Sequence, residues 1–196
     1  MEKQIIISIG REFGSKGHLI AEKIAKDFEI AFYDRNLLDA IAEEKDMNAE
    51  HLEKYDERPR NRILSRNVNG HSNSMEDHLV QMQFEFLQKK AESGESFVIV
   101  GRCARTALKD YDNVISIFVL GDKEDKMAHV MEKFNLSEKE ALMKMMRHDK
   151  TRKAYHNRYS EYKWGDSRGY DLCINSSKLG MEKTAQLIEE YVKERM

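Results

Sequence analysis

Residues 4–28 read QIIISIGREFGSKGHLIAEKIAKDF: an apolar run, a glycine-rich turn and an amphipathic run in succession. The apolar run at 4–9 is typical of a parallel strand covered on both faces, and apolar positions recur at helical spacing over 19–28. A glycine-rich turn between a strand and a helix N-terminus directs backbone N–H groups inward, where they bind phosphate. The stretch therefore predicts an α/β unit with a phosphate site at the turn.

The same alternation continues along the chain. Short β-branched runs occur at 96–100, 114–120 and 170–175, with a weaker strand candidate at 30–33. Helical spacing recurs at 37–41, 79–87 and 127–134. Alternating strands and helices favour a parallel sheet with right-handed crossovers, in which ligands bind beyond the carboxyl ends of the strands. The loops that follow strands are therefore the places to search for a site.

The composition predicts one domain over residues 1–196 and excludes several classes of protein. With 196 residues, of which 40% are hydrophobic, the chain can bury a core. Its 33 Lys and Arg against 35 Asp and Glu give a net charge of −2, without the positive field that binds nucleic acid or an anionic membrane. Two cysteines without CxxC spacing, and no long apolar segment, predict a cytoplasmic chain without disulfides, structural zinc or membrane spans.

Two segments interrupt the alternation. Residues 58–74 hold the only proline and four arginines among turn-forming residues, which predicts a mobile insert between helices. Residues 147–169 are dense in cations and aromatic rings, and a capping box at Ser137 and Glu140 predicts a helix that enters them. We interpret this second segment as a lid.

The turn is a near match to the phosphate-binding motif GxxxxGK[ST]. Gly10 and Lys16 stand at the motif's spacing, Ser15 replaces its second glycine and Gly17 follows the lysine. Where such a loop ends in GKGT, the threonine supplies a hydroxyl near Mg²⁺, and His18 stands at that position here. The lysine of such a loop reaches the outer phosphates of a nucleotide. Because an imidazole poorly replaces a hydroxyl ligand of Mg²⁺, the metal is left to the phosphates, to water or, after a one-residue shift in register, to Ser15. The alternative is a glycine-rich turn with a surface lysine.

Five stretches carry a resemblance that is more specific than the turn alone. They are SIGREFGSKGH, AFYDRNLL, VIVGRCA, RHDKTRKAYHNRY with KWGD, and YDLCINSSKLG, all within residues 4–180. Together they resemble the cytidylate kinase-like family, a branch of the P-loop nucleoside monophosphate kinases. The resemblance implies a three-layer P-loop kinase fold: a five-stranded parallel sheet in order 2-3-1-4-5, flanking helices and a lid. It also implies ATP- and Mg²⁺-dependent phosphoryl transfer to CMP, dCMP or a similar small acceptor, with the insert near 58–74 on the acceptor side.

Phosphoryl transfer requires positioning and converging positive charge more than covalent help. The turn motif and the resemblance together assign catalysis to Lys16, Arg147 and Arg152. They assign the donor phosphates to Gly10, Arg11, Gly14, Ser15, Lys16, Gly17 and His18. They assign the acceptor to Asp34, Arg35 and Arg102, and the lid to Asp149, Lys153, Tyr155, Tyr159 and Trp164.

Each assignment has a structural alternative. The basic segment is otherwise a solvated helix face, and its aromatic rings either stack a base or pack the lid against the body. Asp34 either contacts the acceptor's sugar or base, or caps the helix that follows it. Asn175, with the serines after it, either edges the donor base or caps the last helix. Of the cysteines, Cys173 is predicted to lie in the core and Cys103 to be partly exposed at the site.

Three other functions compete with a nucleotide kinase. A catalytically weak nucleotide-binding sensor is favoured by the departures at Ser15 and His18, and a kinase of a non-nucleotide small molecule is the second alternative. An RNA-binding module that uses 58–74 and 147–169 is the third, and the net charge of −2 weighs against it. We therefore expect small-molecule nucleotide substrates as partners, without nucleic acid or membrane.

Overall fold

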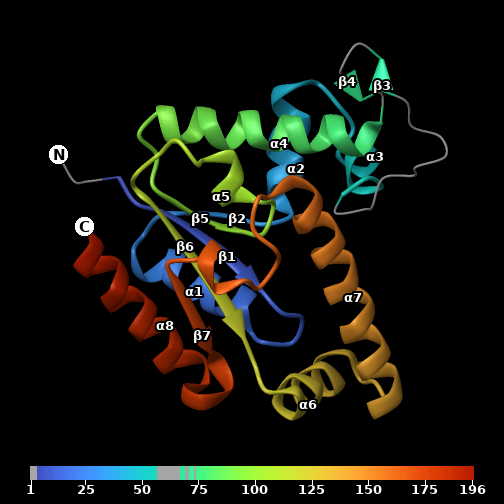
Figure 1. Cartoon of the computed structure of the whole chain (residues 1–196), viewed down its shortest axis with the longest axis vertical. Coiled ribbons are helices and arrows are strands. Elements are labelled where there is room, and N and C mark those ends of the chain that lie inside the picture. The colour runs from blue at the N-terminus through green and yellow to red at the C-terminus, as the bar shows by residue number, and fades with distance from the viewer. Residues whose placement is uncertain (1–3, 57–66, 69–70, 73) are drawn as a thin grey trace.

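The computed structural model describes residues 4–56, 67–68, 71–72 and 74–196. Its centre is a five-stranded parallel sheet in the spatial order β2-β5-β1-β6-β7 (Figure 1). The strands are β1 (Ile6–Arg11), β2 (Ala31–Tyr33), β5 (Phe97–Val100), β6 (Val114–Leu120) and β7 (Leu172–Asn175). Counted along the chain without the short pair β3 and β4, this is the order 2-3-1-4-5, so the predicted α/β fold is confirmed.

Helices cover both faces of the sheet. One face carries α1 (Gly17–Asp27) and α8 (Ser176–Arg195), and the other carries α2 (Asn36–Glu44), α3 (Ala49–Glu53), α4 (Met75–Glu92) and α5 (Ala104–Ala107). The helices α6 (Lys123–Phe134) and α7 (Glu138–Tyr159) follow β6, and a 3-10 turn, η1 (Ser167–Gly169), precedes β7. The predicted helical patterns are confirmed, whereas the sequence does not predict α3 and α5.

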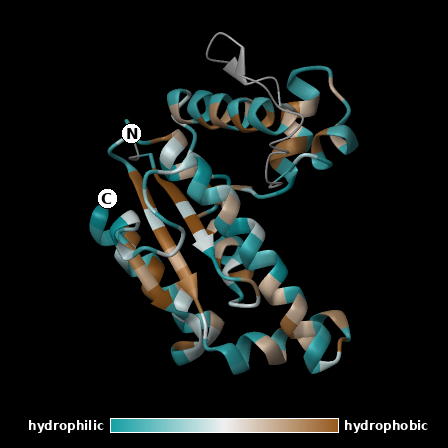
Figure 2. Cartoon of the chain, turned by 45° about the vertical axis from the view of Figure 1, so that its right-hand side comes forward, coloured by the Kyte–Doolittle hydropathy of each residue, from teal (hydrophilic) through white to brown (hydrophobic). Residues whose placement is uncertain are grey.

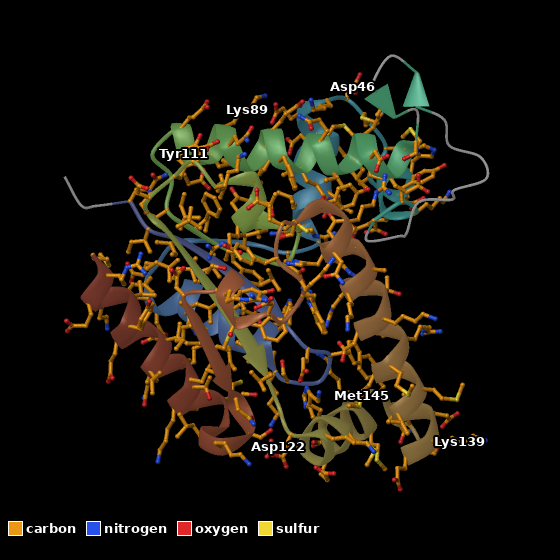
Figure 3. The ribbon with its side chains drawn as sticks, in the orientation of Figure 1. Asp46, Lys89, Tyr111, Asp122, Lys139 and Met145 are labelled. Atoms are coloured by element: carbon orange, nitrogen blue, oxygen red, sulfur yellow. The ribbon has the colours of Figure 1, made fainter. Side chains whose placement is uncertain are left out.

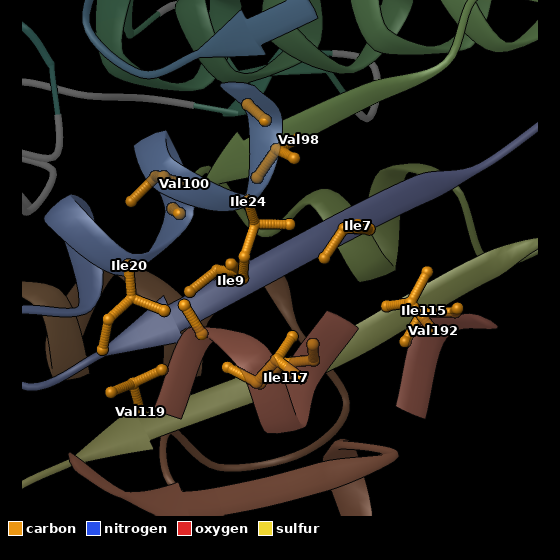
Figure 4. Packing of buried hydrophobic residues seen from close by; sticks show 14 of the residues in the cluster. Ile7, Ile9, Ile20, Ile24, Val98, Val100, Ile115, Ile117, Val119 and Val192 are labelled. Carbon is orange, nitrogen blue, oxygen red and sulfur yellow. The ribbon is translucent and has the colours of Figure 1, made fainter. Parts of the chain in front are cut away.

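The core lies in two layers because side chains of a strand alternate between the faces of the sheet. On one face, Ile7 of β1 packs with Ile24 of α1 and Val192 of α8 (Figure 4). On the other, Ile6 and Phe97 pack beneath α2 and α4. Figure 2 shows the central strands in hydrophobic colours. Burial on both faces explains why these strands read as continuous apolar runs.

The glycine-rich turn is shorter than the motif spacing predicts. Gly10 still belongs to β1, paired with Phe118 of β6, and a Cβ on Gly10 would lie 2.9 Å from that ring. The helix α1 begins at Gly17, and Lys16, which precedes it, has φ +60°. That left-handed conformation favours glycine. The sequence thus places a lysine at a backbone position that favours glycine.

The helix α7 runs along one side of the molecule, from α6 to α4 (Figure 1). The predicted capping box of Ser137 and Glu140 is confirmed at its start. Near its end, the Arg158 guanidinium lies 3.1 Å from the Asp77 carboxylate of α4. The segment predicted as a lid, 147–169, is therefore the C-terminal part of α7 followed by a loop and η1.

The prediction that Cys173 lies in the core is wrong. Its neighbours Leu172 and Ile174 pack against the cluster beneath α1 and α8, so Cys173 faces the opposite side of β7. Because β7 is an edge strand and its other face is less covered there, the thiol is exposed.

The predicted insert at 58–74 lies largely outside the described residues. Within it, β3 (Asn67–Val68) and β4 (His71–Ser72) pair antiparallel. Among the helices of the described ranges, none is both long and apolar enough to cross a membrane.

Candidate active site

A cleft of about 970 Å³ opens at the carboxyl ends of β1, β2 and β5. Its walls are the glycine-rich turn, the first residues of α1 and α2, the end of α3, and one side of α6 and α7. Ten predicted residues meet here: Arg11, Gly14, Lys16, Gly17, His18, Asp34, Arg35, Arg102, Arg147 and Arg152. Segments far apart in the chain thus converge where α/β folds bind their ligands.

One end of the cleft, the basic end, is formed by Lys16, Lys133, Lys144 and Arg147, with His129 among them. Within the described part of the chain, none of the four cations has a carboxylate partner. Burial lowers the pKa of the His129 imidazole, and the charges of Lys16 and Lys133 lower it further. Because these like charges repel one another until an anion lies between them, the basic end suits a polyanionic ligand.

Lys133, Lys144 and His129 are not predicted from the sequence. Val130 of α6 and Ala141 of α7 meet in a buried cluster. Lys133 and Lys144 each lie one helical turn beyond those apolar residues, so the packing of the two helices brings both lysines to the cleft. The apolar spacing of α6 and α7 is the signal that points to them, but only once the two helices are known to pack together.

A stack of rings joins the turn to α6 and α7. The ring of Phe13 lies parallel to that of His148, with centroids 4.3 Å apart, and 6.0 Å from that of Phe134. The Lys144 ammonium lies 4.3 Å from the Phe134 centroid, and the Arg152 guanidinium lies 5.5 Å from the Phe13 centroid. Cation–π contacts of this kind hold the two cationic side chains at the cleft.

Asp149 also fastens α7 to the turn. Its carboxylate accepts a hydrogen bond from the Phe13 N–H at 2.7 Å and lies 4.0 Å from Arg152. Arg152 in turn donates to the carbonyl oxygen of Arg11 at 3.5 Å. Burial raises the pKa of the Asp149 carboxyl, whereas the Phe13 N–H and the Arg152 charge oppose that rise. The helix predicted to enter the lid is thus docked on the turn.

The other end of the cleft, the mixed-charge end, is formed by Arg11, His18, Asp34, Asp56 and Arg102. Asp34 lies 3.0 Å from His18 Nε2 and 3.9 Å from Arg11. Burial raises the pKa of the Asp34 carboxyl, but the hydrogen bond with His18 and the charges of Arg11 and Arg102 outweigh burial and lower it. The capping alternative for Asp34 is wrong, because α2 begins without a side-chain cap.

Arg102 lies in a strained loop directly after β5. Its φ is +60° and that of Cys103 is +51°, both in the region that favours glycine. The Arg102 side chain is 2% exposed and forms an ion pair with Asp56. Asp56 follows α3, which the sequence does not predict, so no pattern singles it out. Cys103 is buried, contrary to the predicted partial exposure.

Seven predicted residues do not line this cleft: Gly10, Ser15, Asp149, Lys153, Tyr155, Tyr159 and Trp164. Ser15 is buried, and its hydroxyl donates to the carbonyl oxygen of Glu12 at 2.9 Å. The Asn175 side chain accepts the Ser177 N–H at 3.0 Å, so the capping alternative is confirmed there. Ser15 and Asn175 are therefore seen in structural contacts.

The lid tyrosines pack against the body. The buried amide of Gln83, on α4, accepts a hydrogen bond from the Tyr155 hydroxyl at 3.1 Å and donates to Asp56 at 3.4 Å. Tyr159 donates its hydroxyl to Asp77. A hydrogen-bonded path therefore leads from α7 through Gln83 and Asp56 to Arg102.

A second, small cavity of about 40 Å³ lies on the far side of Arg11 and Arg102. His156 and Cys103 are among its lining residues, with His156 Nδ1 3.9 Å from the Cys103 sulfur. Burial lowers the pKa of the His156 imidazole below its ordinary 6.5, and a hydrogen bond to the backbone of Tyr162 only partly opposes this. Burial therefore favours the neutral form of the imidazole.

We expect the free energy of unfolding to fall as the pH drops below about 6.5, because the imidazoles bind protons more readily in the unfolded chain. The stabilising contribution is complete above 6.5, and His129, whose pKa is also lowered, acts in the same direction. Urea unfolding between about pH 8 and about pH 5 measures the slope. The variant His156→Gln should flatten it. An equally steep slope in the variant would contradict the assignment of His156.

Comparisons with known proteins support the kinase interpretation. The family model of the cytidylate kinase-like family matches residues 6–178. A crystal structure of an uncharacterized protein from Eubacterium ventriosum is 43% identical, with a TM-score of 0.77 over 97% of this chain and 99% of that chain. No curated protein matches the chain.

Two kinases share the fold at low identity. A gluconokinase from Sinorhizobium meliloti is 12% identical, with a TM-score of 0.58 over 99% of this chain and 94% of that chain. A shikimate kinase from Bacteroides thetaiotaomicron is 13% identical, with a TM-score of 0.56 over 96% of this chain and 98% of that chain. The sheet order, the turn and the family match over residues 6–178 lead to one conclusion: the chain belongs to the cytidylate kinase-like family.

Proposed function

We propose that the chain is a kinase that transfers the γ-phosphoryl group of ATP to a small acceptor. The four cations of the basic end carry the proposal, because a nucleoside triphosphate is a polyanion that matches their charge. They stand beside the glycine-rich turn and the N-terminus of α1, whose backbone N–H groups favour phosphate. Lys16, Arg147 and Arg152 would neutralise the transferring group, and the acceptor would bind at the mixed-charge end.

ATP would bind as its Mg²⁺ complex. Over the described ranges, no three His, Cys, Asp or Glu side chains gather as metal ligands. The Ser15 hydroxyl is engaged with the Glu12 carbonyl, which does not favour it as a ligand. We therefore assign the metal no protein ligand and leave its coordination to phosphate oxygens and water, as Mg²⁺ commonly prefers.

CMP and dCMP are the acceptors that the family description implies, and a non-nucleotide small molecule is the second candidate. Arg35 and Arg102, predicted to bind the acceptor, both line the cleft, which supports an acceptor at the mixed-charge end. The segment at 147–169 would act as the lid, because α7 presents Arg147 and Arg152 to the cleft. Closure over both substrates would exclude water from the transferring phosphoryl group.

The variant Lys144→Gln tests the donor site. We expect its affinity for ATP to fall about 10- to 100-fold, as for the loss of a hydrogen bond to a charged group. Affinity for AMP should change much less, because AMP lacks the outer phosphates. Lys139→Gln is the matched control, since Lys139 lies near the start of α7 and projects away from the body (Figure 3).

Titration calorimetry with ATP and AMP gives the affinities, and coupled ADP release with an acceptor panel gives the activity. Equal losses in Lys144→Gln and Lys139→Gln would contradict the donor site. Tight ATP binding without ADP release from any acceptor would favour the nucleotide-binding sensor instead.

A further inference from the structure

The two ends of the cleft differ in how their charges are balanced. At the mixed-charge end each buried guanidinium has a carboxylate beside it: Arg11 lies 3.9 Å from Asp34, and Arg102 is ion-paired with Asp56. The side chains of Arg11 and Arg102 are 11% and 2% exposed, so neither charge is balanced by bulk water. Among the described residues, and apart from the exposed Arg35, the cations of the cleft without a carboxylate beside them are therefore concentrated at the basic end.

This balance disfavours a monophosphate as the acceptor. A phosphate dianion at the mixed-charge end would compete with Asp56 for the Arg102 guanidinium. Displacing Asp56 would leave a carboxylate, 13% exposed, close to the incoming anion and deprived of its contact with Arg102. Asp34, whose pKa lies below its ordinary value, would add a second negative charge to the same end.

Hydroxyl groups fit the same arrangement without breaking it. A hydroxyl both donates and accepts, so neighbouring hydroxyls can donate to Asp34 and Asp56 and accept from Arg11, Arg102 or His18. A site of alternating carboxylates and guanidinium groups discriminates strongly in favour of such a ligand, because an analogue without the hydroxyls leaves buried polar groups unpaired.

We propose that the acceptor is a polyhydroxylated small molecule, a sugar, sugar acid or cyclitol, which is phosphorylated on a hydroxyl group at the mixed-charge end. This rests on the proposed function. The bond between the γ-phosphorus and the β–γ bridging oxygen of ATP breaks, and its electron pair leaves with ADP. The acceptor oxygen forms the new bond to phosphorus, and its proton passes to the Asp34 carboxylate. Asp34 then releases the proton to water, which can approach because the neighbouring His18 side chain is 43% exposed.

The first measurement is ADP release with ATP and Mg²⁺ from two sets of acceptors. One set holds CMP, dCMP, UMP and AMP, and the other holds pentoses, hexoses, aldonic acids and cyclitols. We expect saturable ADP release with at least one member of the second set and with none of the first. Calorimetry with ATP alone, run in parallel, reports whether the donor site is intact.

The variant Asp56→Asn gives results of opposite sign for the two classes of acceptor. With a polyhydroxylated acceptor, the KM for that acceptor should rise about 10-fold or more, because a hydrogen bond to a charged group is lost. With a nucleoside monophosphate the KM should fall, because Arg102 is released to the phosphate. Asp34→Asn should also raise the KM for a polyhydroxylated acceptor, and this variant serves if Asp56→Asn fails to fold.

Asp46→Asn is the matched control, since Asp46 is exposed after α2 (Figure 3) and its φ of +51° suits asparagine. Phosphorylation of CMP or dCMP, with a KM that falls in Asp56→Asn, would overturn the proposal and leave the proposed function standing. ATP binding without release from any compound of the second set would also overturn it. A chain that binds no ATP would instead refute the proposed function.

Discussion

Replacement of Lys16 by alanine is expected to lower kcat/KM for ATP-dependent transfer by about 100-fold or more, the usual loss when a charge-stabilising donor is removed. Lys16 is exposed at the basic end, so its ammonium group can approach the outer phosphates while its removal leaves the core untouched. Initial rates at varied ATP, together with circular dichroism of the variant, separate lost chemistry from lost fold.

Lys16→Gly separates the charge from the backbone. With φ at +60°, a lysine pays a steric cost that glycine avoids, so this variant should be more stable than the wild type by about 1 kcal/mol. Its activity should nevertheless fall as far as that of Lys16→Ala. Full activity in Lys16→Gly would show that Lys16 is only a turn residue. Phosphate binding would then depend on the cations of α6 and α7.

Arg102→Ala is expected to lower the free energy of unfolding by about 3 to 5 kcal/mol, because it removes the Arg102 charge from beside the largely buried Asp56 carboxylate. Transfer activity should be lost at the same time. Urea unfolding gives the stability. The double variant Arg102→Ala with Asp56→Asn should recover much of this stability, since both charges of the pair are then removed together. A single variant as stable as the wild type would show that the ion pair contributes little.

Arg102→Lys is the conservative companion. It keeps the positive charge but loses the planar fork, so the KM for the acceptor should rise more than the KM for ATP. A rise confined to the KM for ATP would move Arg102 to the donor side of the cleft.

Much of the sheet is predictable from the sequence because β1, β5 and β6 are buried on both faces and read as unbroken apolar runs. The helices α3 and α5 escape prediction, since five and four residues are too few to show a helical period. The fold thus follows from its longest patterns, and the shortest elements become visible only through packing.

The residues of the site also differ in whether the sequence predicts them. Asp34 and Arg102 follow strands directly, so the topology of a parallel sheet places them at the cleft. Lys133, Lys144 and Asp56 reach it through contacts between helices, which no local pattern records. Tyr155 is a residue for which a local pattern misleads. An aromatic residue next to a cluster of cations indicates a ligand, yet the Tyr155 hydroxyl donates a hydrogen bond to Gln83.

The hydrogen-bonded path from α7 through Gln83 to Asp56 has a thermodynamic consequence. One helix lines the cleft with Arg147 and Arg152, which would face the donor, and it contacts through Gln83 the Asp56 carboxylate, which would face the acceptor. We therefore expect that a displacement of α7 by one ligand alters the free energy with which the other binds. Such linkage is reciprocal: the factor by which ATP changes affinity for the acceptor equals the factor by which the acceptor changes affinity for ATP.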